Sequence, residues 1–129
     1  MVGKILVVDD EPHNLEILRI FLRSLNFEIH EAECGMEALK RIEVESFDLI
    51  LLDVMMPDIS GFEISIILRE KEGFDIPIIF LSAKAQKEDI LRGLQVGAVD
   101  YLTKPFDLDL LEMKVANAIK NKEMKNTNL

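Results

Sequence analysis

The sequence predicts an α/β fold in which a five-stranded parallel sheet is covered by helices on both faces. Strand-length apolar runs alternate with segments of helical period along the whole chain, which is typical of βαβ units. Residues 4–9, 48–53 and 77–82 are almost continuously apolar, as strands buried on both faces must be. Since crossovers between parallel strands are right-handed, the connecting helices should lie on both faces of the sheet.

Length and composition indicate one acidic globular domain. The chain has 129 residues, of which 49% are hydrophobic and 30% charged, enough for a single packed core. Its net charge of −9 disfavours direct binding to nucleic acid or an anionic membrane. The apolar start is too short for a secretory signal and no later run reaches membrane-spanning length, so we expect a cytoplasmic domain. Cys34 is the only cysteine, which excludes an internal disulfide.

The first half of the chain should contain three strands and two helices. Residues 4–9 predict a central strand, and the first helix begins near Pro12 because proline is tolerated in a first turn. Residues 27–32 alternate apolar and polar side chains, which favours an edge strand. A second helix is expected over residues 36–45, before the central strand at residues 48–53. The buried face of the first helix is marked by leucines at helical spacing: Leu15, Leu18, Leu22 and Leu25.

The third and fourth helices are bounded by clear signals. Ser60 and Glu63 have the spacing of a capping box, in which each side chain accepts from the other's backbone amide. The central strand at residues 77–82 follows this third helix. A fourth helix is expected over residues 86–96, with Gly97 as its C-terminal cap.

The last strand and helix complete the domain. Residues 99–103 predict the fifth strand, and Asp107 is a suitable N-cap for a helix that ends near Lys122. The remaining segment, residues 123–129, is polar and is expected to fray as a C-terminal tail. We therefore assign residues 1–122 to the folded domain.

Polar side chains follow four of the predicted strands: Asp9 and Asp10, Asp53, Ser82, and Lys104. The carboxyl ends of parallel strands share one edge of the sheet, where ligands bind in open α/β folds. Carboxylates can hold a hard cation, a hydroxyl and an ammonium group can bind phosphate oxygens, and one carboxylate could act as a nucleophile. The set predicts a phosphoryl-transfer site.

A divalent cation would relieve the repulsion among the three carboxylates of this site. Without one, the pKa of at least one carboxyl should rise. The ligands are all oxygens, and no cysteine or histidine lies nearby in sequence to favour zinc. Mg²⁺ is therefore the predicted ion, with Mn²⁺ as a substitute.

Four motifs, VVDDEP, LLDVMMPDISG, IIFLSAKA and GAVDYLTKPF, occur at the expected strand ends and in the expected order. With them, essentially the whole chain resembles the receiver domain of two-component response regulators, the chemotaxis-regulator-like family. The resemblance implies a flavodoxin-like, doubly wound (βα)5 sandwich with strand order 2-1-3-4-5. It also makes residues 1–122 a receiver domain.

The resemblance implies specific roles at the acidic end of the site. Asp53 would accept a phosphoryl group from a phosphohistidine on a sensor histidine kinase or a phosphotransfer protein. Asp9, Asp10, Asp53 and the backbone carbonyl of Met55 would bind Mg²⁺. The domain would catalyse only its own phosphorylation and dephosphorylation, so we do not expect an enzyme that turns over external substrates.

The same resemblance implies a switch. Lys104 would pair with the phosphoryl group, Ser82 would hydrogen-bond to it, and Tyr101 would turn inward to fill the space that Ser82 vacates. The surface of the fourth helix, fifth strand and fifth helix would then change and bind a downstream effector, a fused output domain or a second copy of the chain. Phosphorylation-dependent dimerisation is a hypothesis at this point.

Two further family features concern the loops. The Lys104–Pro105 bond is commonly cis in the family, although only about 5–6% of X-Pro bonds are cis in folded proteins. Met55 and Lys84 occupy the positions that tune phosphate loss, and neither side chain is an obvious activator of water. We expect slow to intermediate hydrolysis.

Other functions were weighed against this one. A Mg²⁺-dependent phosphatase or mutase with an aspartate nucleophile uses similar chemistry, but it carries the nucleophile after its first strand. A flavodoxin-like cofactor binder would need a Ser/Thr/Gly-rich first loop, and a degenerate receiver would lack key residues. Read singly, Asp58, Asp100, His13 and His30 are plain surface groups. The cognate kinase, the output, and whether the domain is free or part of a longer protein stay open.

Overall fold

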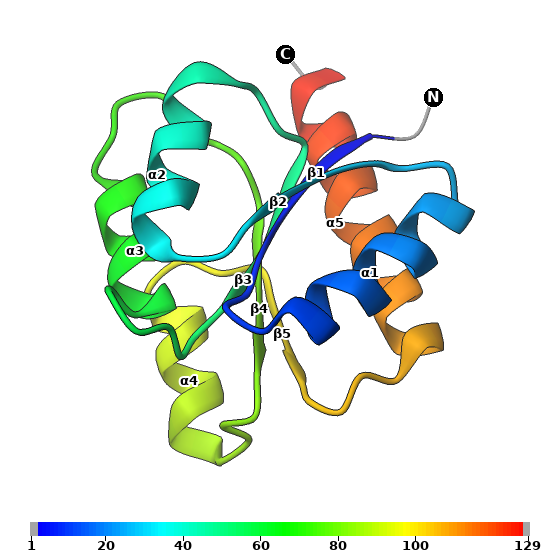
Figure 1. Ribbon diagram of the computed structural model, residues 1–129. Coiled ribbons are helices and arrows are strands. Elements are labelled where there is room, and N and C mark those ends of the chain that lie inside the picture. The colour runs from blue at the N-terminus through cyan, green and yellow to red at the C-terminus, as the bar shows by residue number, and fades with distance from the viewer. Residues whose placement is uncertain (1–2, 128–129) are drawn as a thin grey trace.

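The computed structural model describes the backbone of residues 3–127 and the side chains as far as residue 124. Strands and helices alternate without exception in this part of the chain, as predicted (Figure 1). The ten elements are β1 (Lys4–Val8), α1 (Pro12–Ser24), β2 (Glu28–Ala32), α2 (Gly35–Val44), β3 (Leu49–Asp53), α3 (Gly61–Arg69), β4 (Ile78–Ser82), α4 (Lys87–Gln95), β5 (Asp100–Thr103) and α5 (Leu108–Thr127).

The five strands form one parallel sheet in the order β2-β1-β3-β4-β5, which confirms the predicted fold. The chain runs outward from β1 to β2, then crosses back over β1 to β3 and continues to β5. The direction of winding therefore reverses between β1 and β3, and a ligand site is expected at the carboxyl ends of these two strands. The sequence prediction of an edge position for β2 is correct.

The sheet separates two hydrophobic layers. Alternate residues of each central strand face opposite sides, so Ile5 and Val7 pack into one layer and Leu6 and Val8 into the other. Helices α1 and α5 supply the first layer, whereas α2 and α3 supply the second together with Gly93 of α4, which packs on Phe80. Figure 1 shows this division, with α2, α3 and α4 on one side of the sheet and α1 and α5 on the other. Burial on both faces explains the continuous apolar runs.

Most of the predicted helix boundaries are correct to within about one residue. The amide of Glu63 donates to Ser60 Oγ at 3.2 Å, which is the first of the two bonds of the predicted capping box. Leu110 N donates to Asp107 Oδ1 at 3.1 Å, as expected of an N-cap. Gly97 has a φ of +104°, the left-handed conformation that ends α4.

The predicted end of the last helix is wrong. Helix α5 continues past Lys122 to Thr127, so the segment 123–129 that we expected to fray is helical over most of its length. Residues 128–129 lie outside the described part of the chain. Lysine, glutamate and methionine are good helix formers, and no glycine or proline interrupts them. A polar composition is therefore compatible with helix here and does not mark its end.

Asp58 is not the plain surface carboxylate that the sequence suggested. Its Oδ1 accepts a hydrogen bond from Gly35 N at 3.0 Å and its Oδ2 accepts one from Met36 N at 2.9 Å. Asp58 thereby caps α2 from the loop after β3, in place of Cys34, whose side chain makes no cap bond. The two amides, Met36 first, hold the pKa of Asp58 below its ordinary value.

We predict that Asp58→Ala lowers the free energy of unfolding by about 1 kcal/mol, because two amides at the start of α2 lose their acceptor. Urea denaturation followed by circular dichroism measures the change. Asp75→Ala is the matched control, because Asp75 is an exposed loop aspartate. Equal stability of the two variants would contradict the capping role.

Candidate functional site

The carboxyl ends of β1, β3, β4 and β5 bring the predicted site residues together at one edge of the sheet. Asp9 and Ser82 are completely buried and Asp53 is 3% exposed. Asp10 is exposed at the rim of the site, and Lys104 projects inward from the end of β5. Buried polar side chains are costly unless they are paired, so a group of them at the sheet edge is a candidate active site.

Three carboxylates form the acidic part of the site. One oxygen from each of Asp9, Asp10 and Asp53 lies within 4.8 Å of the other two. Such a set of oxygens fits a hard divalent cation such as Mg²⁺, which takes about one or two carboxylates together with water. The chemistry of the donors therefore agrees with the predicted ion.

Lys104 joins two of these carboxylates. Its Nζ lies 2.9 Å from Asp9 Oδ2 and 3.3 Å from Asp53 Oδ2. Burial lowers the pKa of Lys104, but the hydrogen bond to Asp9 and the charges of Asp53 and Asp9 outweigh it, so the pKa rises overall. The ammonium group is therefore held charged. The Lys104–Pro105 bond that follows β5 is cis.

Asp53 is the most perturbed carboxyl of the site. Burial raises its pKa to about 6, and the charge on Asp9 acts in the same direction. The charge of Lys104 and the amide of Met55, which donates to Asp53 Oδ1 at 3.2 Å, only partly oppose this rise. Without a cation, the charged form of Asp53 is therefore less stable in the folded protein than it is in a solvent-exposed aspartate.

Ser82 and Tyr101 are linked through the backbone of Lys84. The amide of Lys84 donates to Ser82 Oγ at 3.0 Å, and the hydroxyl of Tyr101 donates to the Lys84 carbonyl at 2.7 Å. Tyr101 is only 7% exposed. The family resemblance implies an inward Tyr101 only after phosphorylation, whereas here the side chain is already buried.

Gly93 of α4 explains how Tyr101 fits beneath this helix. A Cβ at Gly93 would lie 2.8 Å from Tyr101 Cδ2 and 3.0 Å from Phe80 Cδ2, closer than carbon atoms can approach without displacement. The absent side chain leaves the space that the tyrosine ring occupies. This contact is a tertiary one, so no local pattern around Gly93 predicts it.

Asn14 and Glu11, which were not among the predicted site residues, lie at the edge of the site. Asn14 Nδ2 lies 3.4 Å from Asp9 Oδ2 and 3.1 Å from Glu11 Oε2, and Glu11 N donates to Asp9 Oδ1 at 2.9 Å. Both residues therefore orient the Asp9 carboxylate. The position of Asn14 in the first turn after the acidic run was the available signal.

Two residues interpreted as plain surface groups have defined partners away from the site. Asp100 Oδ1 accepts from the Tyr101 amide and pairs with Lys114 Nζ at 2.7 Å. His30 is partly buried, with Nε2 2.6 Å from Glu28 Oε2 and Nδ1 2.8 Å from Arg41 Nη2. Only His13 is simply exposed, as expected.

Comparison with known proteins agrees with this geometry. The model of the response regulator receiver domain matches residues 5–116. The chain belongs to the response regulator receiver family. Nisin biosynthesis regulatory protein NisR of Lactococcus lactis is 43% identical over 123 residues, which are 95% of this chain and 53% of NisR. Transcriptional regulatory protein PhoP of Bacillus subtilis is 40% identical over 121 residues, 94% of this chain and 50% of PhoP.

Solved receiver structures share the fold. The receiver domain of Francisella response regulator 1452 superposes with a TM-score of 0.87 at 34% identity, covering 92% of this chain and 98% of that one. A CheY-like receiver from Methanospirillum hungatei superposes with a TM-score of 0.88 at 28% identity, covering 97% and 99%. The chain is thus a receiver domain of the two-component signalling class, and a phosphatase or mutase is not favoured.

The chain spans about half the length of the curated relatives that it matches. Within the described residues, no helix is both long enough and apolar enough to cross a membrane.

We predict that Asp53→Asn stabilises the metal-free receiver at neutral pH. Because the pKa of Asp53 rises from 3.8 to about 6 on folding, the folded state binds more protons than the unfolded state between these values. Wild-type stability therefore falls as the pH rises through this window. The variant has no such proton, so it should be more stable by about 1–3 kcal/mol above the window and nearly equal below it.

Urea denaturation in EDTA across the pH range measures this difference, with Asp75→Asn as the exposed control. Added Mg²⁺ should reduce the advantage of the variant, because a cation stabilises the charged wild-type site. A variant that is less stable than the wild type at neutral pH in EDTA would contradict the prediction.

Proposed function

We propose that this receiver accepts a phosphoryl group on Asp53 from a phosphohistidine of a sensor histidine kinase or phosphotransfer protein. One observation carries the proposal: Asp53 is buried at the centre of the site, within 3.3 Å of the ammonium group of Lys104 and close to the carboxylate of Asp9. Both carboxylates accept one backbone amide, but Asp9 pairs more closely with Lys104, at 2.9 Å, and Asn14 Nδ2 also lies 3.4 Å from Asp9 Oδ2. Asp53 is thus the better nucleophile.

Asp9, Asp10, Asp53 and the Met55 carbonyl would hold Mg²⁺, with Mn²⁺ as a substitute. When bound, the ion neutralises charge on the phosphoryl oxygens and on the carboxylates that face them. The close approach of the three carboxylates supports this ligand set. The Met55 carbonyl is assigned by its position two residues after Asp53.

In the transfer step an oxygen of the Asp53 carboxylate attacks phosphorus, an O–P bond forms and the P–N bond to the donor imidazole breaks. The imidazole leaves with the electron pair of that bond and takes a proton from solvent. Lys104 turns from the carboxylate of Asp53 to the transferred oxygens, where its charge offsets the gain of about one negative charge. The product is an acyl phosphate on the protein's own side chain, so no external substrate is turned over.

Ser82 would then respond to the phosphorylation of Asp53. Its hydroxyl is buried beside the site and accepts from the Lys84 amide, so rotation of the side chain to donate to a phosphoryl oxygen would pull on or break that contact. Tyr101 binds the Lys84 carbonyl, which extends the link to α4 and β5. We assign the output to the surface of α4, β5 and α5, where an effector or a fused output domain would bind in the cytoplasm.

The decisive experiment is incubation with acetyl phosphate, with and without Mg²⁺, followed by intact-mass measurement. The wild type should gain one phosphoryl group only with Mg²⁺, and Asp53→Asn should gain none because the amide is not a nucleophile. Asp58→Asn is the matched control on the same loop and should label like the wild type. Labelling of Asp53→Asn on the same peptide would overturn the assignment.

Phosphorylation-dependent dimerisation is the second part of the proposal. Leu91 and Leu94 of α4 and Met113 of α5 are 47%, 46% and 54% exposed, and a second copy of the chain could cover them. Beryllofluoride should increase the mass measured by light scattering for the wild type but not for Leu94→Glu. Ile20→Glu, on the exposed part of α1, is the control. An unchanged wild-type mass would contradict dimerisation.

A further inference from the structure

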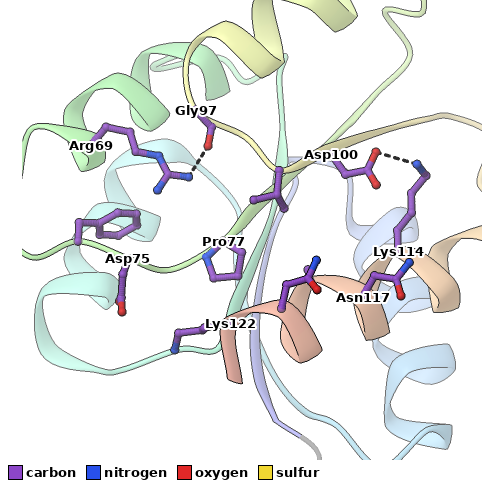
Figure 2. Close-up of a pocket in the computed structure, with 12 residues that line it drawn as sticks. Arg69, Asp75, Pro77, Gly97, Asp100, Lys114, Asn117 and Lys122 are labelled. Atoms are coloured by element: carbon purple, nitrogen blue, oxygen red, sulfur yellow. Dashed lines mark hydrogen bonds and ion pairs between the residues drawn. The ribbon is translucent and has the colours of Figure 1, made fainter. Parts of the chain in front are cut away.

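A cavity lies at the opposite edge of the sheet from Asp53. It has a volume of about 420 Å³, which is within the size range of small-molecule sites. Its walls come from the end of α3 and the loop before β4, from the turn between α4 and β5, and from α5 (Figure 2). None of the residues of the phosphoacceptor site lines it, so it needs a separate explanation.

The charge of this cavity differs from that of the rest of the chain. Its lining holds three cationic residues, Arg69, Lys114 and Lys122, and two acidic ones, Asp75 and Asp100, whereas the whole chain has a net charge of −9. Lys114 pairs with Asp100 at 2.7 Å, and Lys122 is 3.7 Å from Asp48 outside the cavity. With both lysines paired to carboxylates, Arg69 is the cation of this lining that has no ion-pair partner among the described residues, and it favours an anion with a single negative charge.

Arg69 is the group that points to a ligand. Its Nε is buried and has no hydrogen-bond partner, and a buried donor without a partner is unfavourable. Its Nη2 donates to the carbonyl of Gly97, a neutral acceptor, and burial lowers the pKa of the guanidinium. Gly97 covers Nε, so the outer Nη groups are the ones that a ligand could reach; no carboxylate pairs with them among the described residues, and a bound carboxylate would be such a partner.

The guanidinium is also held in place. It lies over the ring of Phe74, 5.3 Å from the ring centroid, and against Gly97, where a Cβ would come within 2.6 Å of Arg69 Nε. In Figure 2, Arg69 and Gly97 form one side of the cavity, and Lys122 and Asn117 lie on the other, with Pro77 between them. A fixed guanidinium loses little freedom when it binds an anion.

The remaining lining is apolar next to this charge. Phe74, Pro77, Val99 and Ala118 line the cavity, and Val99 is 54% exposed. Asn117 and Asn121 add amide groups one helical turn apart on α5. We propose that this cavity is a binding site for a small monocarboxylate with a flat apolar body, which Arg69 holds by its charge and Phe74, Pro77 and Val99 hold by contact.

Phenylacetate is a suitable probe, because it has one carboxylate and one aromatic ring. We expect it to shift the amide NMR signals of Gly97, Asp100 and Asn117 in a saturable way in the ¹⁵N-labelled protein, with no shift at Asp53. The uncharged analogue 2-phenylethanol should bind at least about tenfold more weakly. Arg69→Gln should weaken phenylacetate binding by about tenfold as well.

Asn117→Trp, with a bulky side chain at the mouth of the cavity, should abolish binding, whereas Ala116→Trp is the matched control because Ala116 is exposed on α5 and lies outside the lining. These two variants keep the test valid if Arg69→Gln fails to fold. The proposal is overturned if phenylacetate causes no saturable shifts at millimolar concentration, if Asn117→Trp binds as the wild type does, or if the shifts appear only with an acidic peptide.

Discussion

The ion pair of Lys104 with two buried carboxylates is the constraint on which the site depends. Asp9 and Asp53 are both almost without solvent contact, and two like charges in such a place repel each other strongly. Lys104 offsets this repulsion at 2.9 Å and 3.3 Å, but not fully, since the pKa of Asp53 still rises to about 6. A cation bound by the three carboxylates would offset the repulsion that Lys104 leaves, so its binding would stabilise the charged form of Asp53.

The sheet order is what makes this ion pair geometrically feasible. Strands β1 and β3 are neighbours, so Asp9 and Asp53 lie side by side at their carboxyl ends. Lys104 follows β5 and must reach across the end of β4, where the residue is Ser82. The same serine binds the Lys84 amide, and Tyr101 binds the Lys84 carbonyl. One residue's backbone therefore connects the acidic site to the helix α4, which fits over Tyr101 because residue 93 is glycine.

Much of the fold and of the site could be predicted, for reasons that particular residues make plain. The continuous apolar runs at β1, β3 and β4 arise from burial on both faces, and this requirement acts on every residue of a central strand. Asp107 and Gly97 were found because capping is local. Asp58 and Asp100 were misread because their partners, the amides of α2 and Lys114, are distant in sequence. The end of α5 was predicted too early because a polar composition is common to frayed tails and to helices. The residues of this segment favour helix, and the helix continues to Thr127.

The sequence by itself determined the order of the elements, the two-sided burial of the central strands and the chemical types that follow each strand. These properties depend on neighbouring residues and on the periodicity of apolar and polar side chains, and both can be read from the amino-acid sequence. Only the tertiary structure decided the burial of Tyr101 beneath Gly93, the capping of α2 by Asp58, the rise in the pKa of Asp53, and the cavity around Arg69. Each of these depends on distances and solvent exclusion between residues far apart in sequence, and those exist only once the sheet and its two helical layers have packed.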